Sequence, residues 1–333
     1  MKQEYILGID IGGTETKFGV VKVLSNNKFL LEYFNSIPTK TGMKNFQLML
    51  KNIKNEVENI KDKYPSIKCC GVGVAAMVDY KNGVVINAPN VMWQNLPLKN
   101  SLEKVLNLKV IVDNDANVAT LATYHIEILG KYPEAKNVVC FTLGTGIGGG
   151  VIVDGKLIHG NLGTAGELGH ITINPDGELC GCGNRGCLER YIGARWFVKS
   201  VIEEIKTKKP KTILYKLVNN KIEEITPKIL YEASQKKDKF ALKQWEKYGK
   251  YLGIGVSILL NILNPEIIVL TGGVSSAYKY FLPYTKKEVI ERFWPVVKIK
   301  HYNHAKNIIY HISKGQEYGV KGAAILAYDT FLI

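Results

Sequence analysis

Apolar residues near the start of the chain follow first a strand pattern and then a helix pattern. Residues 5–11 and 17–23 are β-rich runs on either side of the glycine-centred turn GGTE, which predicts a β-hairpin. A third strand is predicted at 29–37. Residues 44–63 are predicted to form an amphipathic helix, because six apolar side chains recur at helical spacing. They are Phe46, Met49, Leu50, Ile53, Val57 and Ile60.

Midway along the chain the opening pattern returns. Buried strands are predicted at 69–77 and 108–113, and a helix starts near Asn114 or Asp115. The run VCFTLGTGIGGGVIV within 138–158 then matches LGIDIGGTETKFGVV in type and length. This weak internal repeat predicts two related α/β halves, with a cleft between them. The second half continues with helices near 192–206, 227–236 and 238–263, a strand at 266–270 and a last helix at 316–329.

Composition narrows the class of protein. A chain of 333 residues suits two domains, and its 46% hydrophobic and 22% charged content is ordinary for a globular protein. The apolar stretch 251–264 is too short to span a bilayer, and Asp10 interrupts any signal-peptide pattern at the N-terminus. We therefore expect a cytoplasmic protein without a membrane partner, whose thiols are reduced.

The net charge of +14 raises the question of nucleic-acid binding. The lysines are spread along the chain, and the densest run, KTKKPK at 206–211, follows a predicted helix and contains a proline. A solvated loop explains this run better than a binding patch. We expect no nucleic-acid partner.

Three glycine turns each follow an apolar strand: DIGGTETK, LGTGIGGG and LTGGVSS. Glycine lets the backbone approach a phosphate and direct several N–H groups at it, although any single turn also fits an ordinary hairpin. The hydroxyls of Thr14, Thr16 and Thr145 and the charge of Lys17 would add to such a site. Asp10, just before the first turn, is either a Mg²⁺ anchor or a turn cap. None of the turns matches the P-loop or the Rossmann pattern.

Polar groups also gather in VDNDAN at 112–117, where a strand gives way to a helix. Ligands bind at such positions in α/β sheets. Asp113, Asn114 or Asp115 could orient an acceptor hydroxyl and remove its proton. Helix capping explains one of these carboxylates equally well.

Three of the six cysteines, Cys180, Cys182 and Cys187, fall within eight positions, and His170 lies ten residues before the first of them. These four residues could form a metal site, a redox pair or a set of buried thiols. The remaining cysteines, Cys69, Cys70 and Cys140, lie in apolar strands and are expected in the core.

The motifs DIGGTETK, NAPNVMWQNLPL, VDNDAN, LGTGIGGG, AGELGH, CGCGNRGCLE and IVLTGGVS occur in one order. Together they resemble the ROK family of sugar kinases and repressors, with the bacterial ATP-dependent glucokinases nearest. The resemblance covers nearly the whole chain. It implies a two-domain, actin-like (ribonuclease-H-like) α/β fold. The N-terminal domain would be 1–114 joined by the last helix at about 316–333, and the C-terminal domain 115–315.

The resemblance also implies roles for residues. Asp115 would be the general base that accepts the O6 proton of a hexose. The sugar would be held by Asn90, Asn114, Glu167, His170 and Glu189. ATP would be surrounded by Gly12, Gly13, Thr14, Thr145, Gly146, Gly272 and Gly273, with Mg²⁺ at Asp10. The family's zinc signature would be His170, Cys180, Cys182 and Cys187, a donor set that suits a closed tetrahedral site.

One departure from the family pattern concerns the substrate. Ala75, Ala76 and Met77, in the run AAMVDY, stand where the family often has a Pro-Gly turn near the sugar. We expect phosphorylation of D-glucose. The alternatives are N-acetylmannosamine, N-acetylglucosamine or fructose phosphorylation by the same scaffold. A sugar-responsive repressor is less favoured, because family repressors place a DNA-binding domain before the first glycine turn. Relatives are often dimers, so we expect a homodimer.

Overall fold

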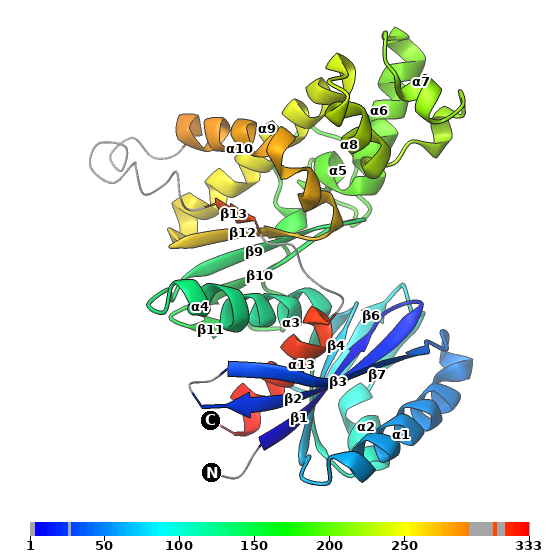
Figure 1. Cartoon of the computed structure of the whole chain (residues 1–333), viewed down its shortest axis with the longest axis vertical. Helices are drawn as coiled ribbons and strands as arrows, with labels where there is room; N and C mark the ends of the chain where they lie inside the picture. Colours follow the sequence, from blue (N-terminus) through cyan, green and yellow to red (C-terminus); the bar gives the residue numbers. More distant parts are fainter. Residues whose placement is uncertain (1–3, 26–27, 293–308, 312–316, 333) are drawn as a thin grey trace. The chain divides into compact units, whose positions relative to one another are not determined.

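The predicted N-terminal hairpin forms part of a five-stranded sheet in the computed structural model of the protein (Figure 1). Strands β1 (Glu4–Ile11) and β2 (Glu15–Leu24) pair antiparallel, and β3 (Lys28–Pro38) pairs antiparallel with β2. On the other side, β4 (Cys69–Val74) and β8 (Lys109–Asn114) continue the sheet in parallel. The strand order is β3-β2-β1-β4-β8, which confirms the predicted strands.

The structure describes residues 4–25, 28–292, 309–311 and 317–332. The chain divides into two compact units. The first consists of residues 1–135, 150–166 and 314–333, and the second of 136–149 and 167–313.

Helix α1 (Phe46–Lys63), which follows the short η1 (Met43–Asn45), buries the predicted face of the amphipathic helix. All six of its predicted apolar side chains are buried, and they share a core with Leu7, Ile9 and Ile11 of β1. Helix α2 (Leu98–Leu106) adds Leu98, Leu102 and Leu106 to the same core.

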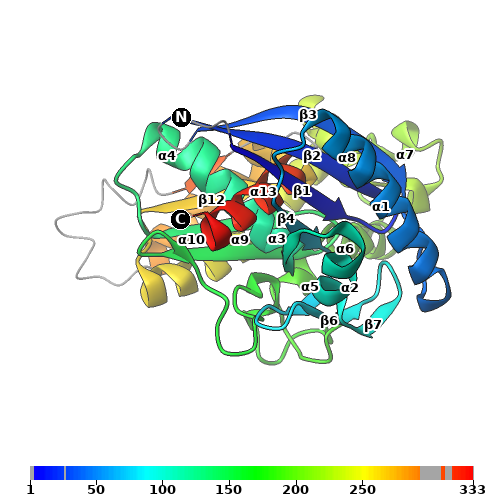
Figure 2. The ribbon, with the colours of Figure 1, turned by 90° about the horizontal axis from the view of Figure 1, so that it is seen from below.

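The last helix, α13 (Tyr318–Phe331), packs against β1 and β4, although it lies far from both in sequence (Figure 2). A Cβ at Gly8 would lie 1.9 Å from the Val320 carbonyl oxygen, and one at Gly71 would lie 1.7 Å from that of Ala323. Only glycine allows this close approach of helix and sheet backbones. The last helix thus belongs to the first unit. Residue 316, in the predicted 316–329, lies outside the described residues.

Helix α3 (Asp115–Ala122) also belongs to the first unit. It continues into a π-helical turn, η2 (Thr123–Ile128), and α4 (Leu129–Lys131). A Cβ at Gly322 of α13 would lie 1.8 Å from the Val118 carbonyl oxygen, so the two helices pack closely. Residues 115–135 and 150–166, predicted to lie in the C-terminal domain, thus belong to the first unit.

A small antiparallel sheet was not predicted from the sequence. It consists of β5 (Met77–Asp79), β6 (Val84–Ala88) and β7 (Trp93–Leu96), in the order β5-β6-β7. Its strands are too short for an alternating pattern to distinguish them from loop. Buried Val85 and Trp93 attach this sheet to the core of the first unit.

The second five-stranded sheet repeats the order of the first. It consists of β9 (Val138–Leu143), β10 (Ile147–Val153), β11 (Lys156–Leu157), β12 (Ile267–Thr271) and β13 (Ile309–His311). Their order, β11-β10-β9-β12-β13, matches β3-β2-β1-β4-β8 strand for strand, with β12 parallel to both β9 and β13. This correspondence confirms the predicted internal repeat.

Helices make up most of the rest of the second unit (Figure 1). The predicted helices appear as α6 (Ala194–Lys208), α8 (Pro227–Gln235) and α9 (Lys239–Leu263). Helix α10 (Tyr278–Arg292) was not predicted; it packs on α9, where Thr285 donates a hydrogen bond to the Gly249 carbonyl. The shorter elements are η3 (Leu168–His170), α5 (Glu189–Ile192), α7 (Leu214–Leu217), η4 (Ile222–Glu224) and η5 (Gly273–Ala277).

Two expectations about the surface can be checked. The lysines of the KTKKPK run at 206–211 are exposed where α6 ends, as expected of a solvated segment. Within the described part of the chain, no helix combines the length and apolar character needed to cross a bilayer.

Candidate functional site

The first glycine turn joins β1 to β2 and lies beside Asn90. The turn is closed by a 3.0 Å hydrogen bond from the Gly12 amide to the Glu15 carbonyl. A Cβ at Gly13 would lie 3.1 Å from the Asn90 carbonyl oxygen, and Thr14 is exposed. The fold therefore brings Asn90, a predicted sugar ligand, to the predicted phosphate turn.

Asp10, near the end of β1, is largely buried beside this turn. It pairs in register with Lys17 of β2. Burial raises the pKa of the Asp10 carboxyl, and the positive charge of Lys17 lowers it by less.

Thr16 does not have the exposure that a phosphate ligand needs. Thr16 is fully buried in β2, and its hydroxyl lies 2.9 Å from that of Thr39. Strand alternation explains this result, because successive side chains of β2 face opposite sides of the sheet. The prediction that Thr16 would offer a hydroxyl to ATP is therefore wrong.

The second glycine turn joins β9 to β10 and is held by a carboxylate from α5. Gly144 donates a 3.0 Å hydrogen bond to the Gly146 carbonyl, and Thr145 between them is exposed. The Ile147 amide donates a 2.8 Å hydrogen bond to Oε2 of Glu189. A Cβ at Gly146 would lie only 2.4 Å from that oxygen, so a larger residue here would displace the Glu189 carboxylate. Glu189, predicted to bind sugar, thus lies against the predicted ATP turn of its own unit.

The third glycine turn follows β12. Gly272 has a φ of +91°, and a Cβ there would lie 2.5 Å from the Leu143 carbonyl oxygen at the end of β9. A Cβ at Gly273 would meet no heavy atom within 4 Å. The second and third turns therefore meet at the ends of two adjacent strands, as expected of a phosphate-binding edge.

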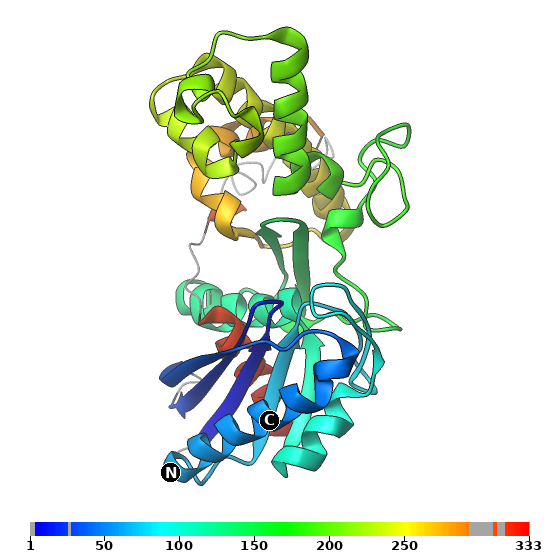
Figure 3. The ribbon, with the colours of Figure 1, turned by 90° about the vertical axis from the view of Figure 1, so that its right-hand side faces the viewer.

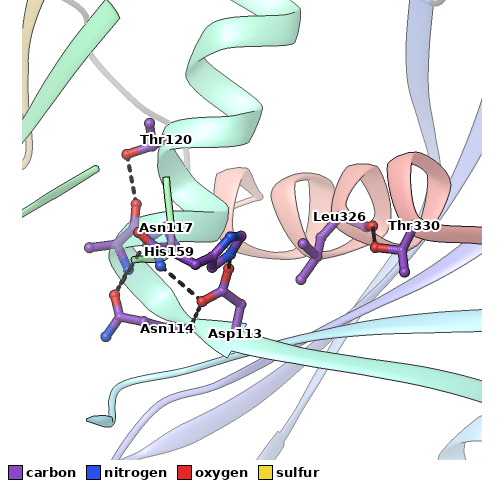
Figure 4. A network of polar contacts seen from close by, with 8 residues as sticks. Asp113, Asn114, Asn117, Thr120, His159, Leu326 and Thr330 are labelled. Atoms are coloured by element: carbon purple, nitrogen blue, oxygen red, sulfur yellow. Dashed lines mark hydrogen bonds and ion pairs between the residues drawn. The ribbon is translucent and has the colours of Figure 1, made fainter. Parts of the chain in front are cut away.

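Asp113, Asn114 and Asp115 of VDNDAN lie in three different environments; Figure 4 shows the first two. Asp113 is completely buried and Asp115 is exposed. Between them, Asn114 caps α3, because its side chain accepts hydrogen bonds from the amides of Ala116 (2.7 Å) and Asn117 (3.3 Å). Nδ2 of the Asn114 side chain also donates a 2.9 Å hydrogen bond to the Ala76 carbonyl.

Hydrogen bonds occupy both carboxylate oxygens of Asp113. Oδ1 accepts hydrogen bonds from the backbone amide of Asn114 (2.7 Å) and from Nδ2 of Asn117 (2.9 Å). Oδ2 lies 2.7 Å from Nε2 of His159. Asp113 is thus a structural carboxylate, and Asp115 is the carboxylate of this motif that a substrate can reach.

The four predicted zinc ligands come together in the second unit. Their ligand atoms all lie within 4.8 Å of one another. Sγ of Cys182 is 3.6 Å from that of Cys187, and Sγ of Cys180 is 3.9 Å from Nδ1 of His170. Ligands at zinc–sulfur distances of about 2.3 Å would stand roughly 3.8 Å apart in a tetrahedron. The donor set and its spacing therefore fit Zn²⁺. Cys69, Cys70 and Cys140 are buried in strands, as predicted.

A tight hairpin presents the three thiols (the green loop beside the helices of the second unit in Figure 3). The Cys180 amide donates to the Asn184 carbonyl at 2.7 Å, and Gly183 and Gly186 have positive φ values. The backbone of Cys187 forms an isolated antiparallel β-bridge with Thr172. Glu189, two residues after Cys187, begins α5. On the other side, exposed Glu167 precedes His170 by one turn of η3.

The predicted residues thus form two sets, each within one unit. The first unit holds Asp10, Gly12, Gly13, Thr14, Lys17, Asn90, Asn114 and Asp115. The second holds Thr145, Gly146, Glu167, His170, Cys180, Cys182, Cys187, Glu189, Gly272 and Gly273. Two side chains near Asp113, His159 and Tyr80, were not predicted. Neither residue belongs to a recognisable sequence motif, and only their contacts in the structure identify them.

Comparison with known proteins assigns the chain to a family. The sequence profile of the ROK family matches residues 6–330. The chain belongs to the ROK family. This ROK protein is 34% identical over 282 residues to the glucokinase of Halalkalibacterium halodurans, which covers 83% of this chain and 82% of the relative. It is also 30% identical over 290 residues to the xylose repressor of Caldicellulosiruptor bescii, covering 86% of this chain and 70% of the repressor.

Among solved structures, the chain is similar to a ROK family glucokinase from Streptomyces griseus in complex with glucose and AMPPNP. The TM-score is 0.76 at 30% identity, over 98% of this chain and 100% of the other. The resemblance inferred from the motifs is confirmed, and so is the predicted α/β, actin-like fold.

Proposed function

We propose that this protein is an ATP-dependent hexose kinase that phosphorylates O6, with D-glucose as its substrate. One observation carries the proposal: Asp115 is an exposed carboxylate at the first position of a helix, next to a capping asparagine and a fully paired Asp113. Such a carboxylate can accept a proton from a bound hydroxyl. The similarity to two bacterial glucokinases, one of them solved with glucose and AMPPNP, supports this assignment.

The transfer is a direct in-line displacement. Asp115 takes the proton of the hexose O6 as that oxygen attacks the γ-phosphorus of ATP. A new O6–P bond forms while the bond from the γ-phosphorus to the β–γ bridging oxygen breaks, and ADP leaves. Backbone amides of the glycine turns stabilise the phosphate charge, which Mg²⁺ held at Asp10 would further neutralise.

The sugar ligands proposed from family resemblance are Asn90, Asn114, Glu167, His170 and Glu189. The structure leaves Asn90 and Glu167 exposed, which suits contact with a soluble ligand. Asn114 uses its side-chain oxygen in the helix cap, so its amide N–H is what it would offer to a hydroxyl.

We further propose that the cluster of His170, Cys180, Cys182 and Cys187 holds one structural zinc ion. Four protein ligands close a tetrahedral site, so the ion would not activate water. It would tie the hairpin 179–185 to η3 and thereby orient Glu167 and Glu189, which flank the cluster in the chain.

The test of function is ADP release with a panel of hexoses in the presence of ATP and Mg²⁺. D-glucose should give the highest kcat/KM. A clear preference for N-acetylmannosamine, N-acetylglucosamine or fructose would make glucose the wrong substrate but keep the kinase. Sedimentation of the purified protein would test the proposed homodimer.

A sugar-responsive repressor is a second candidate, because a xylose repressor is 30% identical to this chain. DNA binding measured across salt concentrations separates the two proposals. Charge-driven attraction to a protein of net charge +14 should disappear as salt rises, whereas a specific operator complex persists at physiological salt.

A further inference from the structure

A histidine from a distant part of the sequence lies against the start of α3. His159 follows β11, and its Nε2 lies 2.7 Å from Oδ2 of Asp113 (Figure 4). A carboxylate oxygen can only accept a hydrogen bond from this partner, so Nε2 carries the proton. His159 is the third donor to a carboxylate that has no exposure to water.

The ring of Tyr80 stacks on the imidazole ring of His159. The two rings stack with centroids 3.5 Å apart and an interplanar angle of 15°. The loop before Tyr80 is the segment that departs from the family's Pro-Gly turn, and its Ala76 carbonyl accepts the hydrogen bond from Asn114. A Cβ at Gly163 would lie 2.7 Å from the Val78 carbonyl oxygen and 2.8 Å from the Tyr80 amide nitrogen. The segment 76–80, which contains β5, and the segment 159–163 are therefore packed together around the start of α3.

The contacts of Asp113 connect His159 to Asp115. An ionised carboxylate without water contact is costly unless its oxygens are paired. If His159 stopped donating, Oδ2 would lose its hydrogen bond and the carboxylate would have to move. Its other oxygen binds the Asn114 amide and the Asn117 side chain, which flank Asp115. Any movement would therefore shift the first turn of α3.

We propose that Tyr80, His159 and Asp113 form a positioning unit that holds the carboxylate of Asp115 in its catalytic orientation. This inference rests on the proposed role of Asp115 as the general base. His159 touches no reacting atom in this scheme; it acts through Asp113. A displacement of about 1 Å in a catalytic group can cost on the order of 100-fold in rate. Loss of the His159 hydrogen bond should therefore lower kcat much more than it changes the KM for ATP.

Two substitutions separate the hydrogen bond from the ring. His159→Phe keeps a ring for Tyr80 to stack on but removes the donor. His159→Gln replaces the ring but places an amide donor near the position of Nε2. We expect kcat for glucose phosphorylation to fall about 10-fold or more in His159→Phe, with the ATP KM within about twofold, and to be largely restored in His159→Gln.

His125 provides a matched control in the same unit. Its Nε2 lies 3.3 Å from Oδ2 of Asp329, and its side chain is 15% exposed, compared with 17% for His159. It also contacts aromatic rings, Phe29 and Tyr124. His125→Phe removes a comparable histidine–carboxylate pair away from VDNDAN and should leave kcat unchanged.

A double substitution distinguishes positioning from general destabilisation. If His159 acts through Asp115, then His159→Phe should cost nothing further once Asp115→Asn has removed the base. A full additional loss in the double variant would overturn the proposal. So would a normal kcat in His159→Phe, or an equal loss in His125→Phe.

Amide hydrogen exchange makes the test independent of turnover. His159→Phe should accelerate exchange at 114–117, whereas His125→Phe should not. If the wild-type protein phosphorylates no hexose, the proposed function fails, and this exchange measurement still decides whether the unit holds α3. Unchanged exchange at 114–117 in His159→Phe would refute it.

Discussion

The two five-stranded sheets share one strand order but hold their polar groups in different ways. In the first sheet the strands themselves supply these groups: Asp10 lies in β1, and Asp113 and Asn114 end β8. In the second sheet the key carboxylate, Glu189, comes from α5 and reaches back to the Ile147 amide. A long segment with little regular structure, which contains the thiol hairpin, precedes Glu189 in the chain.

This difference is consistent with the structural role proposed for the cysteine cluster in the second unit. A side chain on a sheet strand is positioned by the backbone ladder and the core beneath it. Glu167 and Glu189 have no such ladder, and the zinc ion proposed between His170 and the three thiols would take its place. We therefore expect substitutions in the first unit to act on the chemical step, and substitutions around the cluster to act on ligand binding.

The largest effect is expected at Asp115. Asp115→Asn keeps the size of the side chain but removes the base, so kcat should fall by about 10²–10⁴-fold while glucose affinity changes little. Steady-state kinetics and a separate glucose titration measure the two quantities. Near-normal turnover in Asp115→Asn together with an inactive Asp113→Asn would show that the wrong carboxylate has been assigned.

The next largest effect should follow removal of an exposed zinc ligand. Cys182→Ser should lower metal content, measured by elemental analysis, and weaken glucose binding by about 10–100-fold. Nucleotide binding should change less, because the first glycine turn, which would share in it, lies in the first unit. Cys69→Ser, a buried thiol outside the cluster, should keep the metal. A fully active wild-type protein without zinc would contradict the proposed role of the cluster.

A smaller effect is expected where Glu189 contacts the second glycine turn. Gly146→Ala places a Cβ 2.4 Å from Oε2 of Glu189, whereas Gly144→Ala meets nothing closer than 3.8 Å. Overpacking of this kind costs about 1–3 kcal/mol, so Gly146→Ala should raise the glucose KM by roughly tenfold. Gly144→Ala is the matched control and should behave like the wild type. Equal KM values for the two variants would mean that the position of Glu189 does not matter.

The smallest effect concerns stability and pH in the first unit. Because burial raises the pKa of Asp10 above 3.8, the native state binds this proton more tightly than the unfolded state. The stability contributed by protonated Asp10 is present below pH 3.8 and is lost as pH rises through the native pKa. Asp10→Asn should therefore raise Tm at pH 7, and the gain should vanish in acid, while turnover falls.

Asp79 provides a control of opposite sign for that experiment. Hydrogen bonds from Asn82 lower its pKa, so Asp79→Asn should reduce stability at pH 7, and the loss should disappear as pH falls below 3.8. Its side chain is exposed, so the change should be small. Thermal unfolding across pH for the two variants gives the comparison; the same sign for both would exclude this account of Asp10.

Much of the fold could be predicted from the sequence because its signals are local. The face of α1 follows from six apolar residues at helical spacing, and the two glycine hairpins follow from short runs of neighbouring residues. Three thiols of the cluster lie within eight positions, but this spacing left a metal site, a redox pair and buried thiols open, and the family resemblance pointed to zinc. In the helix and the hairpins the residues that interact are close in sequence, so spacing alone predicts the contact.

The different environments of Asp113 and Asp115 are visible only in the tertiary structure. The two carboxylates stand two residues apart in one motif, and position alone favoured neither. Burial of β8 turns the first inward, where its partner is His159, 46 residues away in sequence. Tyr80, β5–β7 and the hydroxyl pair of Thr16 and Thr39 were hidden for the same reason. A local pattern specifies which side chains face a core, but contacts between distant segments exist only once the chain has packed.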